Sequence, residues 1–339
     1  MNALRWGILG TGNIAGQFAA DVVRSARRSR IVAVGSRSSD SAGAFAARHP
    51  IAAAHASYEA LLADRDVDAI YLTLPNSMHH EWTLKSLAAG KHVLCEKPFA
   101  VSEAQSQEMF DAAQRAGKLL VEAFMYRSHP QTLSAIEAVR GGAVGRVQLV
   151  RASFCYRTTR IDDNVRFRAD LAGGALMDVG CYCINFARVI AGEEPTAIFA
   201  AATMHERGVD VNTAGTLHFP GGVLASFACG MNIQTDNAAF VCGDEGFIQI
   251  PWPWKPPKEQ AGFIIARSTP PLQDKKAGAA SPPPRQMIRT EADRDLYALE
   301  ADEFAESVLD SKPPRVSREE TLGNMRVLDE MRRQIGLRF

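Results

Sequence analysis

Short apolar runs alternate with longer amphipathic segments along the first third of the chain. The runs are rich in Val, Ile and Leu and end at turn residues, which is typical of strands buried on both faces. Residues 77–89 and 102–116 repeat their apolar positions with the period of a helix, and Ser102 is suited to cap the second. The alternation predicts a parallel sheet with helices on both faces. The predicted strands are residues 4–9, 31–35, 69–74, 92–95 and 119–123.

From about residue 146 the predicted strands become longer or more closely spaced, and several are joined by hairpin-like turns such as Pro220-Gly221-Gly222. Residues 174–190 and 293–309 are predicted helices on one face of this second sheet. The stretch 251–284 holds many of the 17 prolines and is predicted to be an irregular loop. The expected strands are residues 147–156, 196–203, 213–219, 223–230, 238–242 and 247–250.

These patterns predict an α/β protein with two domains. Residues 1–123 are expected to form a doubly wound parallel sheet. Residues 124–339 are expected to form an α+β domain with a large, mostly antiparallel sheet. At 339 residues the chain is long enough for two separate cores.

The first predicted strand runs into Gly10-x-Gly12-x-x-Ala15, which is a Rossmann dinucleotide fingerprint in the context that the motif requires. Gly10 allows the tight turn, Gly12 lets the backbone approach a pyrophosphate, and Ala15 lets the helix pack closely on the strand. Asn13 and Ile14 open that helix, whose free N–H groups would face the phosphates. The alternative is a plain strand-to-helix turn.

The end of the second strand indicates which dinucleotide would bind. An NAD site usually carries Asp or Glu here for the ribose 2′-hydroxyl, yet the chain has Ser36 and Arg37, and no carboxylate comes before Asp40. A hydroxyl beside a guanidinium suits a 2′-phosphate. We therefore predict NADP as cofactor, with NAD possible; the alternative is that Arg37 is an ordinary solvated loop residue.

Composition narrows the class of protein. The 38 Lys and Arg residues balance 38 Asp and Glu residues, so there is no basic footprint for nucleic acid or for a membrane surface. No apolar stretch of the sequence is evidently long enough to cross a bilayer, and the N-terminus does not resemble a signal peptide. The six cysteines include no C-x-x-C pair, so we expect reduced thiols and no metal site. A cytoplasmic enzyme is expected.

Two further clusters carry candidate chemistry. The fourth strand runs into Glu96-Lys97-Pro98, which places Lys97 at the sheet edge where a nicotinamide would lie. Asp178 and Tyr182 are four residues apart, so on a helix they would project from one face toward a common point. Each cluster also has a simpler interpretation when taken alone. Lys97 could be an ordinary surface lysine, and Tyr182 could be a structural tyrosine that is hydrogen-bonded to Asp178.

Together these residues resemble the Gfo/Idh/MocA family of NAD(P)-dependent oxidoreductases over essentially the whole chain. Many members carry histidine where this chain has Tyr182; tyrosine there resembles the branch with glucose-fructose oxidoreductase, aldose dehydrogenases and dimeric dihydrodiol dehydrogenase, and argues against inositol dehydrogenase activity. The motifs that carry the resemblance are the glycine fingerprint with Gly16, Leu74-Pro75-Asn76-Ser77-Met78-His79, Glu96-Lys97-Pro98, Glu122-Ala123-Phe124-Met125-Tyr126-Arg127 and Asp178-x-Gly180-x-Tyr182.

The resemblance implies roles for these residues. Tyr182 would transfer the proton, with its pKa lowered by the Lys97 ammonium and the oxidised nicotinamide. Lys97 would also stabilise the alkoxide, and Asp178 would orient Lys97 or a substrate hydroxyl. Glu96 and Pro98 would fix the direction of Lys97, with a cis bond before Pro98. Cofactor contacts are expected from Gly10, Gly12, Asn13, Ile14, Ser36, Arg37, Leu74, Pro75, Asn76, His79, Glu96 and Lys97, and substrate contacts from Lys97, Tyr126, Arg127, Asn164, Arg166, Asp178 and Tyr182.

The leading substrate is a sugar or cyclic polyol, most simply an aldose oxidised at C1. A trans-dihydrodiol is the alternative, because several aromatic residues are placed to line a slot for an apolar ring. Two other readings stay open: an NADP-binding sensor without turnover, and a redox-neutral enzyme that holds NAD tightly. Because one face of the second sheet lacks predicted helices, we expect a homodimer or a higher closed oligomer.

Overall fold

The N-terminal half is a six-stranded parallel sheet with strand order β3-β2-β1-β4-β5-β6. The structure is a computed structural model that describes residues 3–267 and 284–339. The strand order reverses between β1 and β4, so a crevice for ligands opens at the carboxyl ends of those strands. The predicted doubly wound sheet is therefore confirmed. Its strands are β1 (Leu4–Leu9), β2 (Ser29–Gly35), β3 (Ala53–His55), β4 (Ala69–Leu72), β5 (His92–Glu96) and β6 (Leu120–Ala123).

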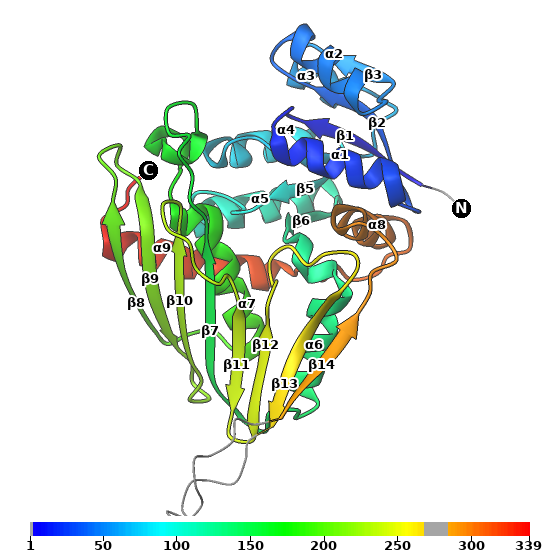
Figure 1. Ribbon diagram of the computed structural model, residues 1–339. Helices are drawn as coiled ribbons and strands as arrows, with labels where there is room; N and C mark the ends of the chain where they lie inside the picture. The colour runs from blue at the N-terminus through cyan, green and yellow to red at the C-terminus, as the bar shows by residue number, and fades with distance from the viewer. Residues whose placement is uncertain (1–2, 268–283) are drawn as a thin grey trace, which may run out of the picture.

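Five helices connect these strands, and a sixth returns from the far end of the chain to cover them (Figure 1). The buried carboxylate of Asp302 in this returning helix accepts hydrogen bonds from the backbone N–H groups of Arg27 and Arg28, at 2.7 and 2.8 Å. The C-terminal segment is thus tied to the first strand-helix unit. The helices are α1 (Asn13–Ser25), α2 (Ser39–Arg48), α3 (Tyr58–Ala63), α4 (His79–Ala88), α5 (Glu103–Ala116) and the returning α8 (Leu296–Leu309).

Several local predictions need correction in this half. Sequence reasoning missed α2, β3 and α3, which lie in an alanine-rich stretch without a strong period. The strand predicted to reach residue 74 ends at Leu72, and α4 begins only at His79, after the 3-10 helix Asn76–Met78. Ser102 does cap α5, because its side chain accepts a hydrogen bond from the backbone N–H of Gln105.

The C-terminal half is an eight-stranded sheet with strand order β14-β13-β12-β11-β7-β10-β9-β8. β7 and β10 pair in parallel and the other neighbours are antiparallel, so the predicted mostly antiparallel sheet is confirmed. The strands are β7 (Val147–Cys155), β8 (Ala197–Met204), β9 (Asp210–His218), β10 (Leu224–Gly230), β11 (Ala239–Gly243), β12 (Gly246–Ile250), β13 (Ala261–Arg267) and β14 (Arg285–Thr290).

The proline-rich stretch 251–284 is not wholly irregular, which corrects the prediction. β13 occupies its middle, pairs with β12 and β14, and buries its first three residues. The part of the predicted loop at 268–283 lies outside the described residues.

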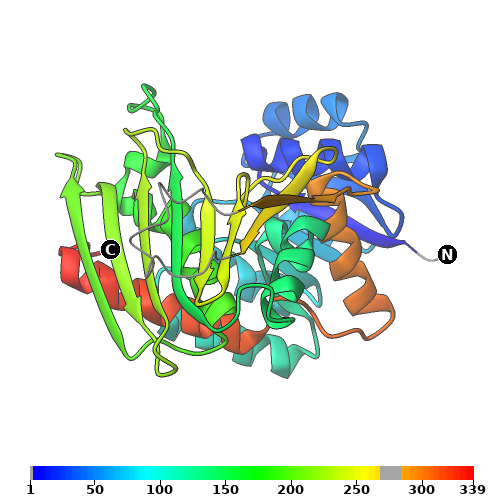
Figure 2. The ribbon, with the colours of Figure 1, turned by 60° about the horizontal axis from the view of Figure 1, so that its bottom comes forward.

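Helices α6 (Pro130–Arg140), α7 (Cys181–Ala191) and α9 (Arg318–Ile335) pack against one face of the large sheet (Figures 1 and 2). α6 and α9 were not predicted, although a capping box of Ser317 and Glu320 opens α9 and Gly336 ends it. The helix predicted at 174–190 is two segments, a π-helix at Leu176–Gly180 followed by α7. The helix predicted at 293–309 begins at Leu296.

One helical stretch corrects the expectation that no segment has the length and composition of a membrane span. Ala169–Ala191 has both, with a mean hydropathy of 1.3 in its most apolar window, but 78% of that window is buried inside the protein. The stretch therefore serves as core between the large sheet and α9. The six cysteines are all free thiols, and five of them are buried.

No helix among residues 3–267 and 284–339 covers the other face of the large sheet. Alternate residues of its strands point outward there, so large apolar side chains are exposed. Phe199 on β8 is 64% exposed and Leu224 on β10 is 51% exposed. Such a face is unusual for an isolated domain.

Candidate active site and cofactor edge

The turn after β1 has the geometry that a pyrophosphate needs. Gly10 has a φ of +117°, and a Cβ there would lie 2.6 Å from the Thr73 hydroxyl, so only glycine fits. A Cβ at Gly12 would meet no atom within 4 Å, which leaves open space at the start of α1. No side chain caps α1 and its first turn, which includes Asn13 and Ile14, holds no acidic residue. The free N–H groups are therefore available to an anion.

The end of β2 places Ser36 and Arg37 beside this turn. Ser36 is buried, and its backbone N–H donates to the carbonyl of His55 at 3.1 Å. Arg37 is exposed. Burial raises the pKa of Tyr58, and the nearby Arg37 guanidinium opposes that rise. The first acidic residue is Asp40 in the first turn of α2, so the edge presents a hydroxyl and a guanidinium rather than a carboxylate.

Hydrogen bonds tie the loops after β4 and β5 together. The two ring nitrogens of buried His79 contact the carbonyl oxygens of Leu74 and Pro98, at 2.8 and 2.9 Å. Burial lowers the pKa of His79, so the ring is neutral and donates to one carbonyl at a time. Pro75 precedes the 3-10 helix, and Asn76 donates from Nδ2 to the carbonyl of Ala172 at 2.8 Å. Asn76 thereby connects the two halves of the protein.

Glu96 and Pro98 hold Lys97 between them. The peptide bond between Lys97 and Pro98 is cis, as the resemblance implied. Glu96 is buried; its carboxylate accepts hydrogen bonds from the Tyr71 hydroxyl and from the backbone N–H of Lys97. The side chain of Glu96 thus holds the loop from its buried side and does not reach the open crevice.

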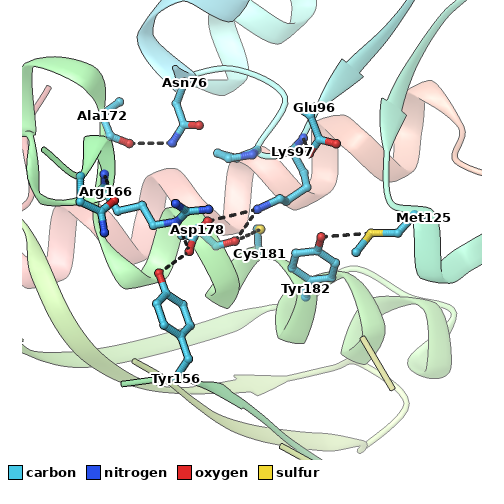
Figure 3. Close-up of polar contacts among 12 residues, drawn as sticks. Asn76, Glu96, Lys97, Met125, Tyr156, Arg166, Ala172, Asp178, Cys181 and Tyr182 are labelled. Carbon is cyan, nitrogen blue, oxygen red and sulfur yellow. Dashed lines mark hydrogen bonds and ion pairs between the residues drawn. The ribbon is translucent and has the colours of Figure 1, made fainter. Parts of the chain in front are cut away.

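Lys97 meets Asp178 across the junction of the two halves, as Figure 3 shows. Its Nζ donates to the backbone carbonyl of Asp178 at 2.7 Å and to Oδ1 of the same residue at 3.3 Å. The third N–H of the ammonium has no protein partner among the described residues, so it is available to a substrate oxygen. A lysine from β5 and a carboxylate from the π-helix therefore form one cluster.

The second oxygen of Asp178 is also fully used. Oδ2 accepts hydrogen bonds from the Tyr156 hydroxyl and from Nε of Arg166, each at 2.7 Å (Figure 3). Asn164 positions Arg166, since its Oδ1 accepts the backbone N–H of Arg166 at 3.1 Å. Sequence reasoning missed the role of Tyr156, because 22 positions separate it from Asp178 and only the fold brings them together.

These contacts set the charges of the cluster. Burial raises the pKa of Asp178, but Arg166 and Lys97 outweigh it and hold that pKa well below its usual range. Burial lowers the pKa of Lys97, and attraction to Asp178 more than restores it, so the net shift is upward. Lys97 is therefore a cation and Asp178 an anion throughout the neutral range. Arg166 remains 46% exposed, so it faces the open side of the cluster.

Tyr182 lies beside Lys97 but is not bonded to Asp178, which corrects the prediction that the two side chains converge. The Lys97 ammonium lies 5.1 Å from the centre of the Tyr182 ring, and the hydroxyl of Tyr182 donates to Sδ of Met125 at 3.2 Å (Figure 3). The reason is that Asp178 belongs to a π-helix and Tyr182 to α7, so the four-residue spacing does not align them.

The pKa of Tyr182 also differs from expectation. Burial raises it well above 10, and nearby Glu96 adds to the rise, so the phenol is neutral in the protein without ligands. Contrary to expectation, Lys97 does not lower the pKa of Tyr182 toward the neutral pH range. The rings of Phe124, Phe154 and Trp254 surround Tyr182 at 5.2, 5.3 and 6.0 Å between ring centres, which explains the strong desolvation.

Tyr126 and Arg127 are not brought into the cluster around Lys97. The Tyr126 hydroxyl donates to Oδ1 of Asn185 at 2.6 Å, and Arg127 donates to the same oxygen and to Glu320. Arg127 also lines a groove of about 370 Å³ whose other walls come from α6, α7 and the start of α9. Their polar atoms are thus engaged in a network apart from Lys97 and Asp178, and their predicted contact with substrate stays a prediction.

The segment after β12 contributes two residues that sequence reasoning did not identify. Trp254 is buried, its Nε1–H donates to the carbonyl of Ser153 at 2.7 Å, and its ring stacks on Phe154. Lys255 follows directly and is exposed. Partial burial lowers the pKa of Lys255, as does repulsion from Lys97, so its ammonium shares the electrostatic surroundings of the cluster. In the sequence, the signal that could have indicated an ordered segment here is the Trp-Lys-Pro-Pro pattern at residues 254–257.

Comparisons with known proteins agree with this architecture. A model of an oxidoreductase family with an NAD-binding Rossmann fold matches residues 4–124, and the Gfo/Idh/MocA C-terminal domain model matches residues 132–249. The chain is 34% identical over 327 residues to D-xylose 1-dehydrogenase (NADP(+)) 2 of Haloferax volcanii, covering 96% of this chain and 95% of that protein.

Two further relatives differ in their named substrates. Over 262 residues the chain is 38% identical to trans-1,2-dihydrobenzene-1,2-diol dehydrogenase of Bos taurus, covering 75% of this chain and 76% of that protein. The solved structure of a 3-ketoreductase from Actinomadura kijaniata, in complex with NADP and TDP-benzene, matches with a TM-score of 0.87 and 30% identity over 98% of both chains.

Proposed function

The chain belongs to the Gfo/Idh/MocA family of NAD(P)-dependent oxidoreductases, and we propose that it transfers hydride between NADP and a hydroxyl-bearing carbon of a sugar or cyclic polyol. The proposal is that of an aldose 1-dehydrogenase-like enzyme. The observation that carries it is the meeting of Lys97 with Asp178 at the carboxyl edge of the parallel sheet, with one ammonium N–H free for a substrate oxygen.

NADP fits the open turn at Gly12 and the edge formed by Ser36 and Arg37. The uncapped start of α1 would receive the pyrophosphate, and Arg37 with Ser36 the 2′-phosphate. The loops from Leu74 to His79 and from Glu96 to Lys97 would line the rest of the site. When bound, the nicotinamide supplies or accepts the hydride, so every proton step falls to the protein.

Lys97 would stabilise the oxyanion that develops on the substrate, because its charge is fixed and its free N–H points to no protein group. Asp178 orients that ammonium and compensates its charge. Tyr182 would donate a proton to the substrate oxygen in reduction and take it back in oxidation. In the part of the chain that the structure describes, its hydroxyl has only a thioether as partner, a weak acceptor that a substrate oxygen would replace at little cost.

Arg166, held by Asn164 and half exposed, would contact other substrate hydroxyls. Tyr126 and Arg127 would instead stabilise the packing behind Tyr182. The sugar assignment is supported by the D-xylose 1-dehydrogenase relative. The second candidate is a trans-dihydrodiol dehydrogenase, which is favoured by the relative of that name and by the half-buried ring of Phe154 next to Tyr182 and Trp254.

A substrate panel tests the proposal. Aldoses, cyclic polyols and trans-dihydrodiols would be supplied with NADP or NAD, and absorbance of the reduced nicotinamide would be followed. Turnover of aldoses with NADP is the expected result, and preferential turnover of dihydrodiols would select the second candidate. No reduction of cofactor with any substrate would contradict a dehydrogenase, and a cofactor that survives dialysis would then indicate redox-neutral chemistry.

Arg37→Asp is expected to weaken NADP binding by at least about tenfold while leaving NAD unchanged or improved, since a charge-assisted hydrogen bond contributes roughly 1.5–3 kcal/mol. Fluorescence titration of NADPH and NADH measures both affinities. Arg30→Asp is the control, because Arg30 is an exposed arginine at the opposite end of β2. Equal losses for both cofactors in Arg37→Asp would reject the 2′-phosphate site.

The exposed face of the large sheet is expected to pair with a second copy of the chain. Light scattering at micromolar concentration should give at least twice the mass of one chain. Phe199→Glu combined with Leu224→Glu should shift that mass to the monomer, whereas Val23→Glu on α1 should not, although Val23 is also exposed. A monomeric wild type would contradict the pairing.

A further inference from the structure

Glu122 lies directly beneath the loop that carries Lys97. It belongs to β6, is paired in register with Cys95 of β5, and is only 1% exposed. Its Oε1 accepts the backbone N–H of Phe99 at 3.1 Å. Phe99 follows the Lys97–Pro98 peptide at once, so this bond fixes the loop on the side away from Glu96.

The second oxygen of Glu122 has no partner among the described residues. Glu300 of α8 is a second buried acid in this half of the protein, and its carboxyl lies near Glu96. Oε2 of Glu300 likewise lacks a partner, and Glu300 makes no bond to the Lys97 loop. Of these two buried acids, only Glu122 accepts a hydrogen bond from the loop that carries Lys97.

The groups that face Glu122 come from several elements. Cys95 belongs to β5, and Lys97 is the first residue after that strand. α7 contributes Cys181 and Arg188, and α9 contributes Thr321. Burial raises the pKa of Glu122 to about 8, against the opposing effects of Thr321, the Phe99 N–H, Arg188 and Lys97. At neutral pH the carboxyl is therefore mostly protonated.

We propose that Glu122 is a positioning residue for Lys97: the carboxyl of Glu122 accepts the hydrogen bond from the Phe99 N–H, fixes the loop there and so sets where the lysine points. The proposal rests on the role given to Lys97 above. A buried carboxylate with an unpaired oxygen is costly, whereas the neutral acid keeps an acceptor for Phe99 without an uncompensated charge. Glutamine preserves that acceptor and methionine removes it at similar size.

Kinetics separate positioning from simple stabilisation. Glu122→Met is expected to lower kcat about 10-fold to 100-fold with NADP affinity within about twofold of wild type, since small displacements of a reacting group are costly. Glu122→Gln should restore kcat. Glu300→Met removes the other buried acid, which makes no bond to the loop, and should leave kcat unchanged. Equal losses in Glu122→Met and Glu300→Met, or failure of Glu122→Gln to restore kcat, would overturn the proposal.

Stability against pH gives a readout that needs no substrate. The folded pKa of Glu122 lies above the ordinary value of 4.5, so the folded state holds an extra proton between about pH 4.5 and 8 and loses stability as pH rises through that window. The Tm of Glu122→Gln should therefore match wild type near pH 5 and exceed it increasingly toward pH 8. A constant difference across this range would show that Glu122 is charged.

Hydrogen exchange of the Phe99 amide separates this proposal from the proposed reaction. The amide should be protected in wild type and in Glu122→Gln and should exchange faster in Glu122→Met, whatever substrate the protein uses. Unchanged protection in Glu122→Met would reject the positioning role. If the exchange result holds but no substrate is oxidised or reduced, the proposed function fails and the structural link from Glu122 to the loop stands.

Discussion

Lys97→Met should lower turnover by at least about 10³-fold while NADP affinity changes little. The substitution removes the cation that stabilises the developing oxyanion, and loss of one such donor alone costs about 10²–10³ in rate. It also leaves Asp178 with one cation instead of two, so the carboxylate is free to turn toward Arg166. Steady-state kinetics with the best substrate of the panel, together with NADPH titration, measure both effects.

Lys91→Met provides the matched control for this experiment. Lys91 is a buried lysine directly before β5, and its ammonium donates to the carbonyls of Asp64 and Val67 at 2.6 and 2.7 Å. Its loss should reduce the free energy of unfolding without changing kcat of the folded fraction. If Lys97→Met and Lys91→Met lower Tm similarly and neither lowers kcat, Lys97 is only a structural lysine.

The strands of the parallel sheet and the turn at the cofactor site could be predicted from the sequence because their signals lie within a few neighbouring residues. Apolar runs mark β1, β4 and β5, and Gly10 with Gly12 must adopt the turn whatever lies around them. β3 is short and half exposed, so its apolar pattern is too weak to stand out. β13 was missed for another reason: it lies within a proline-rich stretch, while the strand itself is stabilised by pairing with β12 and β14.

The cluster around Asp178 was only half predictable. Lys97 and Asp178 follow from their motifs, but the hydroxyl on Asp178 comes from Tyr156 of the segment after β7, not from Tyr182 one turn away. A change of helical type within a few residues decides which side chain reaches the carboxylate, and sequence periodicity does not report it. The pKa of Tyr182 likewise depends on burial among rings from distant segments, which are Phe124, Phe154 and Trp254.

The high pKa of Tyr182 changes how its role should appear with pH. A neutral phenol is the form that donates a proton, so reduction should proceed at neutral pH without an alkaline requirement. Oxidation requires the deprotonated form of Tyr182, the phenolate, to accept the proton of the substrate. Because the fraction of phenolate grows with pH, the rate of oxidation should rise between pH 7 and 10. Wild-type profiles in the two directions should therefore diverge, and parallel profiles would favour Lys97 as the proton carrier.

Tyr182→Phe should lower turnover about 10²–10⁴-fold in both directions, which is the usual contribution of general acid-base catalysis, and should abolish the rise of oxidation with pH. Stability should change little, because the lost hydrogen bond is to the thioether of Met125. Tyr297→Phe is the control: Tyr297 is a buried tyrosine of α8 whose hydroxyl has no partner among the described residues, so its removal should affect neither rate nor profile.

The double variant Lys97→Met with Tyr182→Phe shows whether the two residues act as one unit. Because both serve the same substrate oxygen, their losses should be far from additive, and the double variant should be little slower than Lys97→Met alone. Additive losses would place the two side chains in separate steps. Near-wild-type turnover in Tyr182→Phe would remove the tyrosine from the reaction and leave the Lys97 ammonium, oriented by Asp178, as the group that exchanges the proton.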